Sequence, residues 1–221
     1  GDGTGWAMDT DLSDADASFI GEDIYAHSGC AVSGAGDVNG DGYDDFLIIS
    51  APIQPTIAGQ TYLILGKASG WAMDTDLSDA DASFIGEENS DRSGYAVSGA
   101  GDVNGDDYDD FIIGAYGNDD GGDFSEAGQT YLILGKSSGW AMDTDLSASS
   151  ASFIGSDADD RGGWDVSGAG DVNGDGYDDF IIGSPGNDDG GQGSDNRGQT
   201  YLILGDGTGW AMDTDLSDAD A

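Results

Sequence analysis

The stretch Asp37-Val38-Asn39-Gly40-Asp41-Gly42-Tyr43-Asp44-Asp45 decides how this chain is organised, because it recurs as residues 102–110 and 171–179. In each copy oxygen-bearing side chains occupy positions 1, 3, 5 and 9, and a glycine or an aspartate occupies position 6. Such spacing in a tight loop turns alternate side chains toward one point, where they can surround a cation. Asp, Asn and Gly are also ordinary turn residues, so one copy alone would be compatible with a solvated acidic turn. Three intact copies favour a metal loop.

The set of donor atoms predicts the metal. Three carboxylates and an amide, with no His or Cys, favour calcium over zinc or copper. We therefore expect about one calcium ion in each repeat, or three in this chain. The backbone carbonyl of the tyrosine at position 7 is the expected fifth ligand. The predicted ligands are Asp37, Asn39, Asp41, Tyr43 and Asp45 in the first loop, Asp102, Asn104, Asp106, Tyr108 and Asp110 in the second, and Asp171, Asn173, Asp175, Tyr177 and Asp179 in the third.

The loop differs from an EF-hand after position 9. An EF-hand needs a glutamate at position 12 and a helix on either side. Position 12 is Ile48, Ile113 or Ile182, each inside a short apolar run that begins with phenylalanine. Such runs, bounded by Gly, Ser or Pro, are typical of buried strands. The metal loops are therefore expected to lie between strands.

Longer repeats predict the architecture. Trp-Ala-Met-Asp-Thr-Asp-Leu-Ser begins at Trp6, Trp71, Trp140 and Trp210, and each unit closes with Gly-Gln-Thr-Tyr-Leu-Ile-Leu-Gly. Each unit offers about four short strands, which in the first unit surround residues 19–20, 31–33, 46–49 and 61–65. We predict an all-β chain of about three β-propeller blades, each with four antiparallel strands. The aromatic residues that recur once per unit, Trp6, Phe19, Tyr43 and Tyr62 in the first, are expected to pack between blades.

The expected blade boundaries follow from the same sequence repeats. They place blade 1 at residues 18–66, blade 2 at 67–135 and blade 3 at 136–205, with 206–221 as the start of a next repeat. Residues 1–17 form an inter-blade segment that is identical to 205–221. Propellers typically have four to eight blades, so three units suggest part of a longer array or an assembly with further copies of the same repeat.

The repeats resemble FG-GAP repeats, the blades of the integrin α-subunit propeller and of many prokaryotic surface proteins. The loop of residues 37–45, followed by an apolar strand, is the most specific part of this resemblance. At the Phe-Gly position of the family this chain has Cys30, Tyr95 or Trp164, so that motif is degenerate here. The resemblance implies calcium loops on one face of a propeller and partners that are engaged through loops elsewhere.

Composition restricts the partners. The formal net charge is -40, with 45 acidic and 5 basic residues, so nucleic acid and anionic membrane surfaces are poor partners. Most carboxylates cannot be metal ligands, because three calcium ions would change the charge only from -40 to -34.

The single Cys30 allows no internal disulfide. No apolar run is long enough to insert into a membrane. We expect an extracellular or cell-surface location.

The sequence offers little for catalysis. His27 is the single histidine and has no equivalent in the other units, and adjacent carboxylates such as Asp44-Asp45 recur in every unit, whereas a catalytic pair is normally unique. We expect no enzyme activity and a structural role as part of a tandem array or filament. One alternative is an adhesion module that binds a surface glycan or protein through the variable acidic loops around residues 118–122 and 187–191. Another is a propeller appended to a secreted enzyme.

The three metal loops are not expected to be equal. Position 6 is Gly42 in the first loop, Asp107 in the second and Gly176 in the third. A tight turn there is expected to need a left-handed backbone, which Asp tolerates less well than Gly. The second loop is therefore predicted to bind calcium most weakly.

Overall fold

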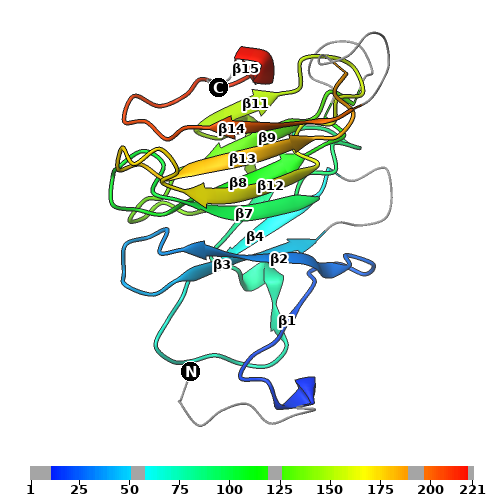
Figure 1. Ribbon diagram of the computed structural model, residues 1–221. Helices are drawn as coiled ribbons and strands as arrows, with labels where there is room; N and C mark the ends of the chain where they lie inside the picture. Colours follow the sequence, from blue (N-terminus) through cyan, green and yellow to red (C-terminus); the bar gives the residue numbers. More distant parts are fainter. Residues whose placement is uncertain (1–10, 51–57, 119–125, 189–196, 219–221) are drawn as a thin grey trace.

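The structure is a computed structural model that describes residues 11–50, 58–118, 126–188 and 197–218. The sequence repeats form three antiparallel sheets stacked face to face, as three blades of a partial propeller (Figure 1). This arrangement confirms the all-β prediction. The first sheet contains β2 (Ser28–Gly36), β3 (Asp45–Ser50), β4 (Gln60–Ile64) and β6 (Ala82–Ile85); the second β7 (Ala96–Gly101), β8 (Asp110–Ala115), β9 (Gln129–Ile133) and β11 (Ala151–Ile154); the third β12 (Asp165–Gly170), β13 (Asp179–Ser184) and β14 (Gln199–Ile203).

In the first two sheets, the fourth antiparallel strand comes from the following unit. Strand β6 pairs antiparallel with β4, with Thr61 opposite Phe84, and β11 pairs with β9 in the same register. Each sheet therefore begins one strand later than the blade range expected from the sequence, and the first two sheets also end one strand later. The reason is that the last Leu-Gly of a unit leads into a long connection, and the chain returns to the same sheet after it. Strand β1 (Phe19–Ile20) accordingly lies outside the first sheet.

The connections between sheets contain short strands that pair in parallel, and 3-10 helices. Strand β5 (Thr75–Asp76) pairs with β1, and the equivalent strands β10 (Thr144–Asp145) and β15 (Thr214–Asp215) pair with β6 and β11. One 3-10 helix follows each strand: η2 (Leu77–Asp79), η3 (Leu146–Ala148) and η4 (Leu216–Asp218), while η1 (Leu12–Asp14) precedes β1. An aspartate caps η2, because the Asp76 side chain accepts a hydrogen bond from the Ser78 N–H at 2.9 Å.

The core lies between the sheets. Along β3 the side chains alternate, so that Leu47 packs toward the second sheet and Ile48 packs toward the opposite face. Each phenylalanine at the start of a central strand contacts a phenylalanine from earlier in the chain and a tryptophan from later in it. The rings of Phe84, Phe111 and Trp140 show this, with centroids 5.5 to 6.4 Å apart. The prediction that Phe and Trp pack between blades is confirmed for these residues. Trp6 lies outside the described residues.

Candidate metal loops at one edge of the stack

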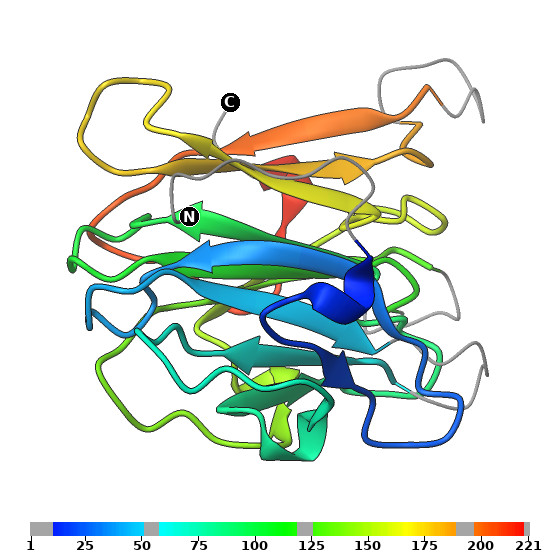
Figure 2. The ribbon, with the colours of Figure 1, turned by 90° about the horizontal axis from the view of Figure 1, so that it is seen from below.

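All three nine-residue loops lie at one edge of the stack, the left edge in Figures 1 and 2. Each joins the first two strands of a sheet: residues 37–44 link β2 to β3, and the equivalent segments link β7 to β8 and β12 to β13. The pairing shifts register just before each loop, between Gly34 and Gly36 in the first sheet. The irregularity redirects the chain into the loop and away from the flat sheet.

The side chains at positions 1, 3 and 5 fold back on the loop's own amides. Asp37 accepts hydrogen bonds from the N–H groups of Asp41 (3.0 Å) and Gly42 (2.8 Å). Asn39 accepts from Asp41 at 2.8 Å, and Asp41 accepts from Tyr43 at 3.0 Å. The second and third loops repeat these bonds residue for residue. The loop therefore has a single repeated conformation, with its predicted ligands on one short turn.

Position 6 has the backbone that the sequence predicts. The φ angles are +88° at Gly42, +70° at Asp107 and +97° at Gly176, all in the left-handed region. Asp107 is therefore strained relative to the two glycines.

The carboxylate at position 9 serves as an anchor beneath each loop. Asp45 is buried, and its two oxygens accept hydrogen bonds from the N–H groups of Val38 at 3.0 Å and Gly66 at 2.6 Å. Asp110 and Asp179 are buried and make the equivalent bonds. Each carboxylate thus fastens its loop to the end of the third strand. This anchoring role was not predicted, because the sequence alone suggested only a ligand.

The loop carboxylates influence one another electrostatically. The pKa of Asp45 is raised to about 6, chiefly by burial and also by the negative charges of Asp41 and Asp37, against the opposing effect of the two backbone hydrogen bonds. The pKa of Asp110 is raised to about 7 by the same causes, with Asp106 and Asp102 as the neighbours. In both loops the carboxylates at positions 1, 5 and 9 therefore share one electrostatic neighbourhood.

The donor set fits a hard cation, although the side chains are not gathered around one. The groups present are carboxylate, amide and main-chain oxygens, the ligands that calcium takes. Across the described ranges no three His, Cys, Asp or Glu side chains converge closely enough to hold a metal between them. The oxygens at positions 1, 3 and 5 are turned to the loop amides instead. The predicted ligand sets, including the carbonyls of Tyr43, Tyr108 and Tyr177, remain predictions.

The structure adds a residue that sequence reasoning missed, the aspartate at position 8. The Asp109 carboxylate of the second loop accepts a hydrogen bond from the Asp37 N–H of the first loop at 2.8 Å. In the next pair of loops, Asp178 accepts from the Asp102 N–H at 3.2 Å. Its recurrence in all three units was the available signal. Position 8 therefore links one loop to the next.

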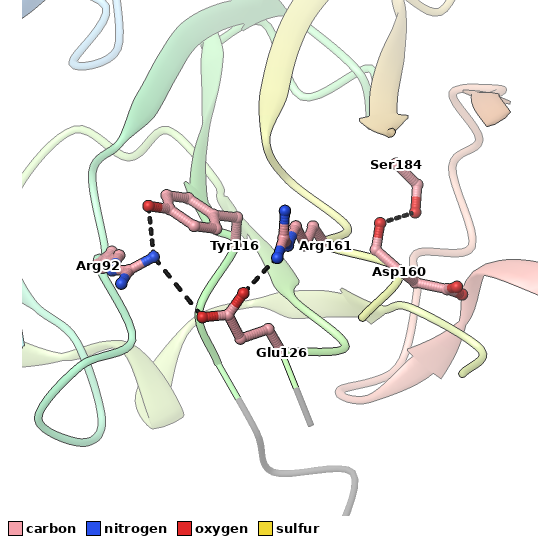
Figure 3. Close-up of polar contacts among 6 residues, drawn as sticks. All are labelled: Arg92, Tyr116, Glu126, Asp160, Arg161 and Ser184. Carbon is pink, nitrogen blue, oxygen red and sulfur yellow. Dashed lines mark hydrogen bonds and ion pairs between the residues drawn. The ribbon is translucent and has the colours of Figure 1, made fainter. Parts of the chain in front are cut away.

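The opposite edge carries a different cluster of side chains. Glu126 lies between two arginines, 3.7 Å from Arg92 and 3.0 Å from Arg161 (Figure 3). Arg92 also donates a hydrogen bond to the Tyr116 hydroxyl, and the Tyr116 ring lies 4.5 Å from the Trp164 ring. These contacts tie the second blade to the third on the side away from the loops. The variable segments of this chain, residues 51–57, 119–125 and 189–196, lie outside the described residues, so the expected adhesive loops fall largely there.

The family model for the FG-GAP repeat matches residues 31–64, 93–133 and 162–203, together more than half of the chain. The chain belongs to the FG-GAP repeat family. Each match begins near the first strand of a sheet, contains the nine-residue loop and ends at the third strand. Each sheet thus corresponds to one FG-GAP repeat, and the resemblance inferred from the loop sequence is confirmed.

Several integrin α subunits are similar to part of this FG-GAP chain. Integrin alpha-IIb of Mus musculus is 32% identical over 108 residues, which is 48% of this chain and 10% of that protein. Integrin alpha-PS2 of Drosophila melanogaster is 34% identical over 92 residues, 41% of this chain and 7% of that protein. Integrin alpha pat-2 of Caenorhabditis briggsae is 30% identical over 99 residues, 45% and 8% respectively. The chain therefore spans a tenth or less of the length of these relatives. In the described residues no helix is long and apolar enough to cross a membrane.

Proposed function

We propose that this chain is a non-enzymatic calcium-binding FG-GAP module with an extracellular structural role, as part of a tandem array or filament. The observation that carries the proposal is the loop that recurs three times with one conformation. In the first two copies, carboxylates that raise the pKa of a buried neighbour lie within nine residues of one another. Such grouping of like charge is costly without a cation and favourable with one.

Each ion would be held by one loop. The residues at positions 1, 3 and 5 would supply side-chain oxygens, position 7 its carbonyl and position 9 a carboxylate, as in the sets named above. A bound calcium ion would supply positive charge and replace several of the hydrogen bonds that now fix the loop. The position-9 residue, such as Asp110, would then join the ion to the end of β9 through its bond to the Gly135 N–H. Binding of the ion would thereby stabilise the attachment of the loop to the sheet.

Calcium counting tests the proposal. Equilibrium dialysis of the full chain should give about three calcium ions bound per chain, with dissociation constants of about 10⁻⁴ to 10⁻³ M, the range of extracellular modules. Asp171→Ala removes position 1 of the third loop and should lower the count by one. Asp79→Ala removes an exposed carboxylate of η2 and should leave the count unchanged. Saturation at no ions, or equal loss in both variants, would refute the proposal.

An adhesive role is the second candidate, favoured by the similarity to integrin α subunits. In that case a surface glycan or another protein would bind the edge opposite the metal loops, where Arg92, Arg161 and the ring of Trp164 are partly exposed. Saturable binding to a glycan or protein panel that is lost in Trp164→Ala would support it. A structural module binds no member of such a panel.

A further inference from the structure

Each internal boundary between blades brings one nine-residue loop against the next. At the first boundary, Asp109 of the second loop holds the backbone of Asp37 on both sides. The Asp37 N–H donates to the Asp109 carboxylate at 2.8 Å, and the Asp109 N–H donates to the Asp37 carbonyl at 3.3 Å. The neighbouring Tyr108 ring covers Gly40, because a Cβ added to that glycine would lie 2.7 Å from the ring. Positions 7 and 8 of one loop therefore lie on the loop before it.

The second boundary repeats these contacts with the same residue types. The Asp102 N–H donates to the Asp178 carboxylate at 3.2 Å, and the Asp178 N–H donates to the Asp102 carbonyl at 3.1 Å. The Tyr177 ring covers Gly105, since an added Cβ there would lie 2.6 Å from it. Because both boundaries lie inside the described chain and have the same construction, the contact between loops is a property of the repeat.

The glycine before each held aspartate makes room for this contact. The φ angle is +79° at Gly36 and +77° at Gly101. A Cβ added to Gly36 would overlap the Asp109 carboxylate, and one added to Gly101 would overlap the Asp178 carboxylate. Glycine adopts this backbone without strain and leaves space for the neighbouring side chain. The Gly-Asp pair at the start of a loop is thus fitted to the position-8 aspartate of the next loop.

The residue held in this way is the first predicted ligand of its loop. Asp37 occupies position 1, and its carboxylate accepts hydrogen bonds from the N–H groups of Asp41 and Gly42. Because the second loop fixes the Asp37 backbone, it also determines where the Asp37 carboxylate lies. A ligand that is already in place loses less conformational freedom on binding, which raises the affinity. Asp109 is therefore placed to act on the predicted calcium site of the first loop.

A second route joins the anchors at position 9. The Asp110 carboxylate of the second loop accepts a hydrogen bond from the Gly135 N–H at 2.7 Å. The next residue, Lys136, donates its N–H to the Val38 carbonyl of the first loop at 2.8 Å, and the Val38 N–H donates to the Asp45 carboxylate at 3.0 Å. Val38, Asp45 and Asp110 are buried, so water does not compete for their bonds. Main chain and hydrogen bonds thus connect the position-9 carboxylates of the two loops.

We propose that the position-8 aspartates, Asp109 and Asp178, are positioning residues for the calcium site of the preceding loop, and that neighbouring loops bind calcium cooperatively through them. The inference rests on the calcium function proposed above and adds how its sites are regulated. Positions 7 and 9, on either side of Asp109, become fixed when the second loop is occupied, and Asp109 then holds Asp37 in its binding position. Occupation of one loop raises the affinity of the loop before it, and by linkage the reverse effect is equal.

Simple repulsion between ions would give the opposite effect. Two cations in neighbouring loops repel each other, so electrostatics alone makes occupation of one loop lower the affinity of the next. A rise in affinity therefore has to come from the arrangement of the ligands. The effect is also local, because Asp109 contacts the first loop and Asp178 contacts the second. The same substitution one blade further along the chain should move the most affected site one loop further along.

Calcium titration of the full chain, followed site by site, tests the positioning. The amide signals of the position-6 residues Gly42, Asp107 and Gly176 report the three loops separately by NMR. Asp109→Ala should raise the dissociation constant of the first loop at least about five-fold, the lower end of typical coupling, and leave that of the third loop nearly unchanged. Asp178→Ala should instead weaken the second loop more than the first. Equal weakening of all three loops by either variant would indicate general destabilisation and overturn the proposal.

Matched variants separate positioning from charge. Asp44→Ala removes the same carboxylate from the first loop, where no residue that the structure describes donates a hydrogen bond to it, in contrast to Asp109. It should weaken the first loop less than Asp109→Ala does. Asp109→Asn keeps an oxygen that can accept from the Asp37 N–H, so it should restore nearly the wild-type affinity. If Asp44→Ala and Asp109→Ala weaken the first loop equally, or if Asp109→Asn is as weak as Asp109→Ala, charge alone explains the effect and the proposal is wrong.

A double-mutant cycle tests the cooperativity. Asp102→Ala removes a predicted ligand of the second loop and leaves the side chains that contact the first loop unchanged. It should weaken the first loop in the wild-type chain but add no further weakening in an Asp109→Ala background. If three ions bind and each substitution alters only the loop that carries it, the coupling is refuted and the calcium function stands. If no loop binds calcium, the proposed function fails, and this inference fails with it.

Discussion

A methyl group at Gly105 should destabilise the chain more than the same group at Gly174. Both residues occupy position 4 of a nine-residue loop, with φ of +75° and +79°, so the cost of a left-handed alanine, about 1 kcal/mol, is common to both. They differ in their surroundings. A Cβ at Gly105 lies 2.6 Å from the Tyr177 ring of the next blade, and one at Gly174 meets nothing within 4 Å.

The difference in stability between the two variants measures the contact of the Tyr177 ring with Gly105. Forcing a close-packed ring to move costs about 1 to 3 kcal/mol, so Gly105→Ala should lose about 2 kcal/mol more than Gly174→Ala. For a chain of this size that corresponds to a difference of roughly 6 °C in Tm. Thermal unfolding by circular dichroism, at a concentration where the chain is monomeric, measures it.

A double-mutant cycle completes this test. In a Tyr177→Ala background the ring is absent, so Gly105→Ala should cost no more than Gly174→Ala. If the two glycine variants melt together in the wild-type background, or if removal of the ring leaves their difference intact, the inferred contact between neighbouring loops is wrong.

Further predictions concern single residues. Asp107→Gly should tighten calcium binding in the second loop, because it removes a strained left-handed aspartate; isothermal titration that shows equal or weaker binding would count against the strain argument. Leu146→Ala should lower the free energy of unfolding by about 2 to 5 kcal/mol, because Leu146 is completely buried, whereas Leu12→Ala at the exposed equivalent position should change it by less than about 0.5 kcal/mol. Urea unfolding distinguishes these two outcomes, and equal effects would contradict the assigned burial.

The sequence predicted the local structure well because local rules determine it. The Phe-Ile runs became central strands, and position 6 took a left-handed backbone at Asp107 as at the two glycines. Both follow from short-range patterns, alternation in the strands and turn geometry in the loops.

The sequence could not assign the outer strand to its sheet. The text Ser-Phe-Ile-Gly lies between two units, and either neighbour could have accepted it. Pairing with β4 is decided by the long connection of residues 66–81, which returns the chain to the sheet that it left. Long-range topology of this kind leaves no signal in one unit's sequence.

Two roles of the acidic residues could not be predicted from the sequence either. The anchoring by Asp110 depends on the Gly135 N–H, 25 residues away, and the link by Asp109 depends on the Asp37 N–H, 72 residues away. In sequence, positions 8 and 9 are two adjacent aspartates with nothing to separate their functions. Only the packing of one loop on the next makes one a link and the other an anchor.

Thermal unfolding with and without calcium tests the central claim most directly. At about 10 mM calcium and a dissociation constant of about 10⁻³ M, each loop would add about 1.4 kcal/mol, and three loops about 4 kcal/mol. Tm should then rise by roughly 10 °C relative to chelator. Magnesium at the same ionic strength controls for general screening of the acidic surface and should give much less. Equal melting in calcium, magnesium and chelator would contradict the claim that these loops hold calcium as part of the fold.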